Sequence, residues 1–194
     1  MNQISVKEAV DKIFYYYENF GERDYIGEPV TQIEHMVQGA MFAEQDRREP
    51  EIILAMFLHD IGHLLELELN DSKEKMGDLG VMNHEGKGRK FLEDMGVPYP
   101  IPNLVENHVK VKRYLVGKNQ EYYQKLSDAS KQTLAYQGGP MSPEEIVSFE
   151  TDPLFSDSLL VREYDEMSKV PNIKLKSLDF YRGFLTSYLL LKSS

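Results

Sequence analysis

The middle of the chain reads Pro50-Glu51-Ile52-Ile53-Leu54-Ala55-Met56-Phe57-Leu58-His59-Asp60-Ile61-Gly62-His63. Proline suits the first turn of a helix, and the apolar run from Ile52 to Leu58 leaves that helix without a polar face, so we expect it to be the central helix. His59 and Asp60 continue the same run. A carboxylate buried among Ile, Leu, Met and Phe is costly unless it is paired or bound to a metal. The segment therefore predicts a metal site in the core.

The histidines are regularly spaced along the chain. His35, His59, His84 and His108 are 24, 25 and 24 residues apart, and each falls in a different expected helix or at its start. A helix of about a dozen residues plus its connection uses roughly that length, so an antiparallel bundle could bring these positions together. His63 lies one turn after His59 on the expected helix, which makes it a rival ligand. Taken singly, any of these histidines is more simply a polar core or surface residue.

Composition limits the chemistry. The 194 residues include no cysteine and carry a formal net charge of -10, so a metal site must use His and carboxylates. No long run of Lys and Arg is present, which argues against nucleic-acid binding and favours a small-molecule partner. The first eight residues do not resemble a secretory signal, and no window approaches the roughly 20 apolar residues of a membrane span. We therefore expect a cytoplasmic protein with no membrane partner.

Helical periodicity dominates, and no stretch shows the sustained alternation of a half-buried strand. We therefore predict an all-α protein and one domain over residues 1–194. Capping boxes, prolines and glycines place the expected elements. In the first half of the chain we expect a helix after the capping box Thr31–Glu34, a helix from Pro50, and a helix from about Asn83 as N-cap to Met95 before a left-handed Gly96. In the second half we expect a helix from Pro102 to Gly117, a broken helical region over 118–139, and helices after the capping box Ser142–Glu145, over about 157–169 and over about 177–191. Loops are expected at 66–82 and 96–101.

The order His35, then His59-Asp60, then a distant Asp165 resembles the H…HD…D pattern of the HD-domain superfamily, and the additional His84 and His108 resemble its two-metal members. Within it, nearly the whole chain is most similar to the mixed-valence diiron oxygenases that cleave 1-hydroxyphosphonates. The HD pair alone is typical of the whole superfamily, whereas the joint presence of several segments is more selective. The segments that carry the resemblance are Asp24–Glu28, Gln32–His35, Leu58–His63, His108–Val116, Leu126–Ser130 and Tyr136–Met141.

This resemblance implies an HD-domain helical bundle with a dimetal site in its core and two iron ions, Fe(II) and Fe(III), with O2 as co-substrate. The implied ligands of the first iron are His35, His59, Asp60 and Asp165, and those of the second are His84, His108 and the bridging Asp60. The implied reaction cleaves the C–P bond of 2-amino-1-hydroxyethylphosphonate or an N-methylated analogue, giving phosphate and a carboxylic acid such as glycine or glycine betaine. The residues alone leave the substituent on C2 open.

The resemblance also implies roles for three residues near the substrate. Tyr25 and Glu28 would form a gate in which the tyrosine covers the open iron position and the glutamate faces the substrate amine. The residues themselves suggest only an ordinary loop, because Gly27-Glu28-Pro29 is turn-like. His63 would lie beside the substrate, behind the metal ligands.

Two cations share helix faces with expected ligands. Lys112 lies four residues after His108, and Arg162 lies three residues before Asp165. Together they predict an anion site suited to a phosphonate, although either side chain alone would more simply extend to solvent. By resemblance, the hydroxyls of Ser130 and Thr133 also bind the phosphonate, with helix capping or surface exposure as the alternative.

Two other functions remain open. One is an HD phosphohydrolase that acts on a nucleotide or phosphate ester, in which the same metals activate water. The other is a catalytically silent HD-fold binding or scaffold protein. A diiron oxygenase is the first hypothesis because the six expected metal ligands occur in the same chain as Tyr25, Glu28, Lys112 and Arg162. We expect a small organophosphonate as partner and a monomer or weak homo-oligomer.

Overall fold

The computed structural model of the chain describes residues 4–25, 27–69 and 82–193. Helices connected by turns and loops account for its regular structure, and no strand occurs within these ranges. The prediction of an all-α helical bundle is therefore confirmed. The helices are α1 (Val6–Phe20), α2 (Gln32–Gln45), α3 (Pro50–Leu58), α4 (Ile61–Leu69), α5 (His84–Asp94), α6 (Ile101–Lys118), α7 (Gln120–Lys125), α8 (Asp128–Tyr136), α9 (Pro143–Glu150), α10 (Phe155–Met167) and α11 (Leu178–Lys192).

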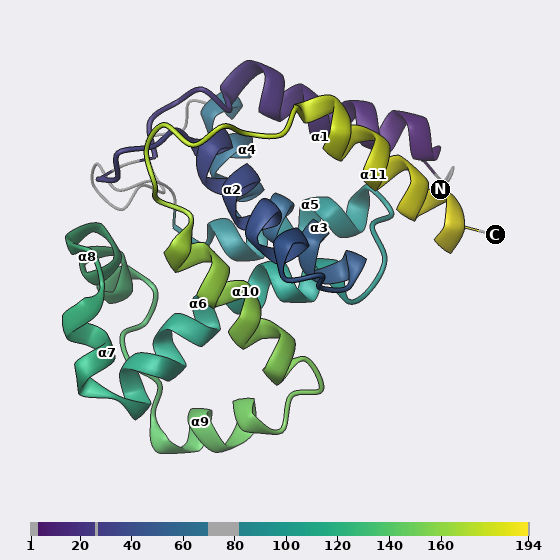
Figure 1. Ribbon diagram of the computed structural model, residues 1–194. Coiled ribbons are helices and arrows are strands. Elements are labelled where there is room, and N and C mark those ends of the chain that lie inside the picture. Colours follow the sequence, from purple (N-terminus) through teal and green to yellow (C-terminus); the bar gives the residue numbers. More distant parts are fainter. Residues whose placement is uncertain (1–3, 26, 70–81, 194) are drawn as a thin grey trace.

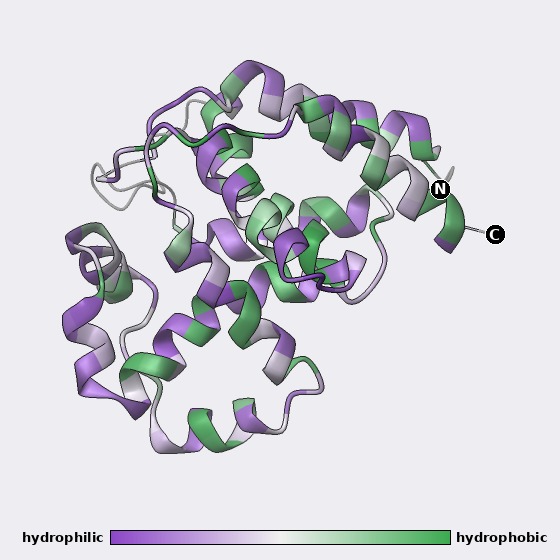
Figure 2. Cartoon of the chain, viewed as in Figure 1, coloured by the Kyte–Doolittle hydropathy of each residue, from purple (hydrophilic) through white to green (hydrophobic). Residues whose placement is uncertain are grey.

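Helix α3 lies at the centre of the molecule, with α2, α6 and α10 packed against it (Figure 1). Every residue from Ile52 to Leu58 is buried, as the all-round apolar sequence predicts, and Figure 2 shows this apolar helix surrounded by other elements. Because α2, α6 and α10 all touch α3, polar side chains on their inner faces meet around its carboxyl end.

The structure corrects one prediction about this segment. His59 and His63 do not share a helix, because α3 ends at Leu58 and α4 begins at Ile61. The two residues between them form a turn in which the carbonyl of Asp60 accepts the N–H of His63 at 3.0 Å, and the Nδ1 of His59 bonds to the carbonyl of Met56 at 2.8 Å. This turn interrupts the helix at the polar pair, so that the two histidines do not lie on one continuous helix.

Gly62 allows α4 to lie close to α5. A Cβ atom at this position would lie 1.9 Å from the backbone carbonyl oxygen of His84, which is far inside van der Waals contact. The nearest neighbour is backbone, so a rotamer change cannot relieve the overlap. Only glycine permits the approach that brings the first residue of α5 next to Asp60.

Replacing Gly62 with alanine is therefore expected to destabilise the protein, because overpacking against fixed backbone costs about 3 kcal/mol or more. For a chain of this size, that loss corresponds to a fall in Tm of about 6 to 12 °C. Differential scanning calorimetry provides the measurement. The matched control is Gly183→Ala in α11, where a Cβ meets nothing within 4 Å and helix propensity predicts a gain of about 0.5–1 kcal/mol. An unchanged Tm for Gly62→Ala would contradict the close approach.

Two ends of the chain complete the core. Helix α1, which we did not predict from sequence, begins at a capping box formed by Ser5 and Glu8, and this S-x-x-E pattern is the signal that could have located it. It lies alongside α11 (Figure 1), and one cluster of buried apolar residues runs from Ala9 to Leu189. A single domain over residues 1–194 stays a prediction, which this shared core supports.

Most of the expected helix boundaries are confirmed, including the capping boxes at Thr31 and Ser142 and the left-handed Gly96, with φ of 74°. Asn83 occupies the N-cap position of α5 as predicted, with a left-handed backbone and no side-chain capping bond. One detail is wrong. The expected loop at 66–82 begins too early, because α4 continues to Leu69, and residues 70–81 lie outside the described ranges.

Across the described part of the chain, no helix combines the length and apolar character needed to cross a membrane.

Candidate metal centre

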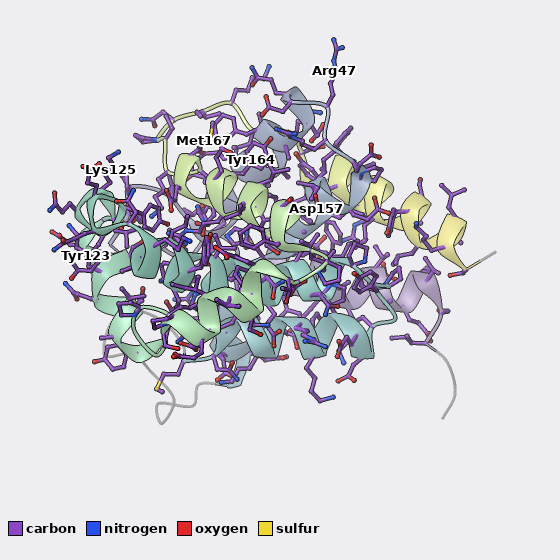
Figure 3. All side chains as sticks on the ribbon, turned by 90° about the horizontal axis from the view of Figure 1, so that it is seen from below. Arg47, Tyr123, Lys125, Asp157, Tyr164 and Met167 are labelled. Carbon is purple, nitrogen blue, oxygen red and sulfur yellow. The ribbon has the colours of Figure 1, made fainter. Side chains whose placement is uncertain are left out.

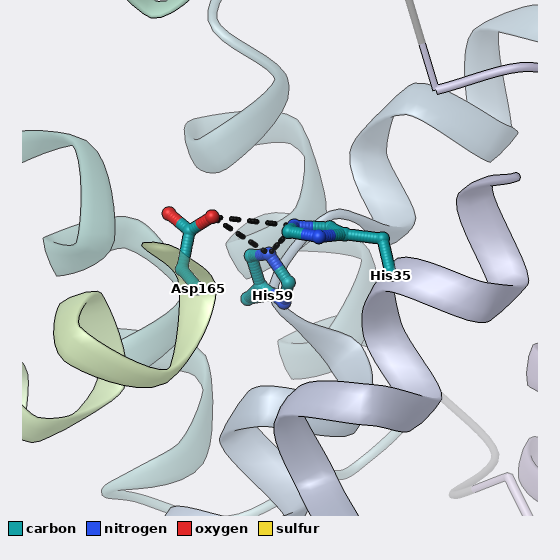
Figure 4. A group of neighbouring side chains, drawn as sticks. All are labelled: His35, His59 and Asp165. Atoms are coloured by element: carbon teal, nitrogen blue, oxygen red, sulfur yellow. Dashed lines mark hydrogen bonds and ion pairs between the residues drawn. The ribbon is translucent and has the colours of Figure 1, made fainter. Parts of the chain in front are cut away.

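Three side chains from three helices converge at the carboxyl end of α3 (Figure 4). His35 comes from α2, His59 follows the last residue of α3, and Asp165 comes from α10. The Nε2 atoms of the two histidines are 3.0 Å apart, and the Oδ1 of Asp165 lies 3.2 Å from the Nε2 of His35 and 4.0 Å from that of His59. All three residues are buried. Their ligand atoms are close enough to hold one metal ion.

A second cluster lies on the other side of Asp60. The Nε2 atoms of His84 and His108 are 3.1 Å apart and lie 3.3 Å and 3.5 Å from the Oδ1 of Asp60. The other oxygen of the same carboxylate, Oδ2, lies 3.4 Å from the Nε2 of His59 and 3.6 Å from that of His35. One carboxylate thus faces both clusters, which is the arrangement a bridging ligand requires.

The hydrogen bonds of the imidazoles fit metal binding. The Nδ1 atoms of His35, His59 and His108 lie 2.9, 2.8 and 2.5 Å from backbone carbonyl oxygens. A carbonyl only accepts, so these Nδ1 atoms carry a proton and each Nε2 faces the site, where it can bind either a proton or a metal ion. The Oδ2 of Asp60 is buried and has no hydrogen-bond partner among the described residues. Lone pairs that face one another at about 3 Å repel unless a cation lies between them.

The electrostatics of the site also favour positive charge. Burial alone would lower the pKa of His59, but the carboxylates of Asp60 and Asp165 raise it to about 9. Burial opposes ionisation of Asp60 as well, yet the neighbouring imidazoles, His59 foremost, hold the pKa of this carboxyl well below its usual range. Burial lowers the pKa of His108 to about 3, so this imidazole stays neutral. Ionised carboxylates and a neutral imidazole are the forms that bind a metal.

His63 is brought to the second cluster despite the turn before α4. Its ring stacks on that of His84, with centroids 3.9 Å apart and an interplanar angle of 19°. Burial and the neighbouring His84 lower the pKa of His63 well below its usual value. Asp60, His63 and His84 also form a group whose ligand atoms could hold one ion. The position of His63 is compatible with two roles, as a metal ligand and as a residue that packs against the ligand His84.

Lys112 and Arg162 are buried, each with 4% of its surface exposed. Neither extends to solvent, whereas ordinary surface cations such as Arg47 and Lys125 project outward (Figure 3). The Nζ of Lys112 donates to the hydroxyl of Thr133 at 3.0 Å. Burial, followed by the charge of Arg162, lowers the pKa of Lys112 to about 7. Both side chains line the same pocket, so two cations that are kept from water lie where an anion could bind.

Arg162 is held in place by three neighbours. Its Nη1 donates to Asp165 at 2.7 Å, and its Nε lies 2.8 Å from Glu166 and 3.1 Å from the hydroxyl oxygen of Tyr122. Burial would lower the pKa of the guanidinium, but Asp165 in particular raises it above its ordinary value. Sequence reasoning missed Tyr122, because nothing in its local pattern distinguishes it from a core tyrosine.

The loop between α1 and α2 covers the first cluster. The ring of Tyr25 stacks on that of His35, with centroids 4.1 Å apart, and burial, reinforced by Asp60 and Asp165, raises the pKa of its phenol. Gly27 has φ of 80°, and a Cβ there would lie 2.8 Å from the Cβ of Ala129. This glycine therefore lets the loop contact α8, and Tyr25 lies against His35. The gate role of Tyr25 and Glu28 stays a prediction.

A pocket joins these elements. Its cavity of about 60 Å³ offers room equivalent to about four water molecules. Sequence reasoning missed Gln32, Gln137 and Lys169, although Lys169 follows Asp165 by four residues and could have been found by that spacing. The pocket is lined by Tyr25, Glu28, Gln32, Asp60, His63, His84, His108, Val109, Lys112, Ala129, Ser130, Thr133, Gln137, Arg162, Asp165 and Lys169.

The core is all-α, and His and Asp side chains from several helices surround one shared carboxylate. This arrangement is typical of helical metal-binding proteins. The HD-domain family model matches residues 33–154 of the chain. The chain is 38% identical over 173 residues to [1-hydroxy-2-(trimethylamino)ethyl]phosphonate dioxygenase (glycine-betaine-forming) of Leisingera caerulea, covering 87% of this chain and 83% of that protein. It is 34% identical over 183 residues to hydroxymethylphosphonate dioxygenase of Gimesia maris, covering 94% and 89%. The chain belongs to the HD-domain phosphonate oxygenases.

An uncharacterized protein of Acanthamoeba polyphaga mimivirus is 50% identical to the chain over 188 residues, covering 97% of this chain and 85% of that protein. The prediction of an enzyme of the C–P-cleaving HD-domain oxygenase class is thus confirmed at the level of the family.

Proposed function

We propose that this protein is a diiron oxygenase that uses O2 to cleave the C–P bond of a 1-hydroxyphosphonate, releasing phosphate and a carboxylic acid. The observation that carries the proposal is the position of Asp60, whose two oxygens face two separate histidine clusters beside a pocket with two buried cations. The sequence resemblance favours 2-amino-1-hydroxyethylphosphonate or an N-methylated analogue as substrate. The named relatives act on different 1-hydroxyphosphonates, one with a trimethylamino group and one without it.

In this proposal, each cluster would hold one iron. His35, His59 and Asp165 would hold the first ion, His84 and His108 would hold the second, and Asp60 would be shared between them. An Fe(II)/Fe(III) pair supplies the O2 and one-electron chemistry that the protein's own side chains lack. His63, stacked on His84, holds that ligand in orientation and faces the substrate.

The protein's side chains bind and enclose the substrate. The Nζ of Lys112 and the guanidinium of Arg162 bind the phosphonate oxygens, with the hydroxyls of Ser130 and Thr133 beside them. Their burial strengthens these charge-assisted hydrogen bonds, because water does not compete for the charges. Tyr25 and the loop that carries it exclude water from the reacting carbon and move when the substrate enters.

The size of the pocket supports a small substrate. A cavity of about 60 Å³ suits a compact phosphonate, whereas a nucleotide would need several times that volume, because ligand sites of that kind span roughly 300–1,000 Å³. This observation favours the oxygenase over a nucleotide phosphohydrolase.

The protein as isolated is expected to contain about two irons per chain, the number two-metal sites need, and to consume O2 only when a 1-hydroxyphosphonate is added. Metal analysis, an oxygen electrode and a phosphate assay test this together. Phosphate released without O2 from a phosphate ester would support the phosphohydrolase alternative instead. Purified protein without iron, and with no turnover after iron is supplied, would favour a silent binding protein.

A further inference from the structure

The pocket contains an ion pair that the metal centre does not use. Lys169 lies just beyond the end of α10, and its Nζ is 2.6 Å from the Oε1 of Glu28. The two side chains are only 18% and 10% exposed, and both line the pocket. The same Nζ lies 6.0 Å from the centroid of the Tyr25 ring. The pair therefore links the loop between α1 and α2 to the segment just after α10, the helix that carries Arg162 and Asp165.

This pair changes the charge that the pocket offers to a substrate. The carboxylates that line it are Glu28, Asp60 and Asp165. Asp60 faces the two histidine clusters, and Asp165 is bound by Arg162 and His35. Glu28 is paired with Lys169. Among the described lining residues, each carboxylate is therefore already matched by positive charge or directed at the metal centre.

We propose that Lys169 determines specificity by excluding substrates with a cationic group on C2, so that the enzyme acts on 1-hydroxyphosphonates whose C2 group is uncharged or absent. The inference rests on the proposed C–P-cleaving oxygenase activity and departs from the amino and N-methylated substrates that the sequence resemblance implies. An ammonium or trimethylammonium group near Glu28 must either displace Lys169 or lie beside it. Like charges a few ångströms apart repel strongly where water is largely excluded, and a displaced Lys169 would leave its own charge partly buried and unpaired.

The pocket also has a group suited to an uncharged substituent. Gln32 is only 6% exposed, and its Oε1 is buried with no hydrogen-bond partner among the described residues. A side-chain amide can donate to or accept from a hydroxyl or another neutral polar group. An unsubstituted substrate, or one with a neutral C2 group, therefore meets neither a charge conflict nor a purely apolar wall.

The test compares three substrates with the iron-loaded enzyme. These are hydroxymethylphosphonate, 1-hydroxyethylphosphonate and 2-amino-1-hydroxyethylphosphonate, and the readout is O2-dependent phosphate release. We expect kcat/KM for hydroxymethylphosphonate and for 1-hydroxyethylphosphonate to exceed that for the amino compound by at least about tenfold. In Lys169→Met, Glu28 regains an unbalanced charge, so the ratio should shift toward the amino compound by about tenfold or more. Anaerobic calorimetric titration should show the same shift in Kd.

Two further variants separate specificity from folding. Adding Glu28→Gln to Lys169→Met restores a pocket without the extra negative charge, so the gained preference for the amino compound should disappear. Lys90→Met, which removes an exposed lysine of α5, should leave all three kcat/KM values unchanged.

The possible failures are distinguishable. If the enzyme releases phosphate but the wild type prefers the amino compound, the specificity inference is overturned while the oxygenase proposal stands. The same conclusion follows if the substrate ratio is unchanged in a folded Lys169→Met variant. If no 1-hydroxyphosphonate supports O2 uptake, both proposals fail.

Discussion

Replacing Asp60 with alanine is expected to remove both irons and with them all O2-dependent phosphate release. Within the described part of the chain, the oxygens of this carboxylate face both clusters, at 3.4 Å from His59 and 3.3 Å from His84. Loss of an outer partner of a metal ligand typically costs roughly 10- to 100-fold in affinity or activity, and loss of a shared ligand should cost more. Metal analysis by mass spectrometry and the phosphate assay measure the two effects.

Two comparisons make this result specific. Asp60→Asn keeps the side-chain volume, so iron loss in that variant as well would show that the negative charge is needed and that a cavity is not the cause. His63→Gln should keep both irons if His63 lies behind the ligands. Full iron content in Asp60→Ala would refute the bridging role, and loss of one iron in His63→Gln would assign His63 to the metal.

Replacing Lys112 with alanine should weaken phosphonate binding and leave the iron content intact. The ammonium group is buried and donates to Thr133, and it contacts the anion only when the substrate is bound. A hydrogen bond to a charged group is worth about 1.5–3 kcal/mol, so KM or Kd should rise by about 10- to 150-fold. Steady-state kinetics and anaerobic calorimetry with hydroxymethylphosphonate give these constants.

The matched control for this variant lies two residues earlier on the same helix. Lys110 has a 40% exposed side chain that pairs with Glu106 at the surface, so Lys110→Ala should change neither binding nor iron content. Equal iron loss in Lys112→Ala and Asp60→Ala would contradict the division between substrate-binding and metal-binding residues.

Local patterns along the chain predicted much of the fold. Capping boxes at Thr31 and Ser142, prolines in first turns and the apolar run before His59 each act within a few residues, so their structural effect is nearly independent of the rest of the protein. The metal cluster could also be anticipated, because a His-Asp pair that continues an apolar run is costly to bury without a partner. The capping box of Ser5 and Glu8 at the start of α1 is a local signal of the same kind.

The sequence by itself determined the helices, the central position of α3 and the inventory of groups that could bind a metal. Only the tertiary structure decided that the chain turns at Asp60, which a continuous apolar pattern conceals, and that Lys112 and Arg162 are buried. It also decided that Lys169 meets Glu28, 141 residues away in the chain. Such contacts depend on how helices distant in sequence pack together, and no periodicity within one helix records which charges will meet across that packing.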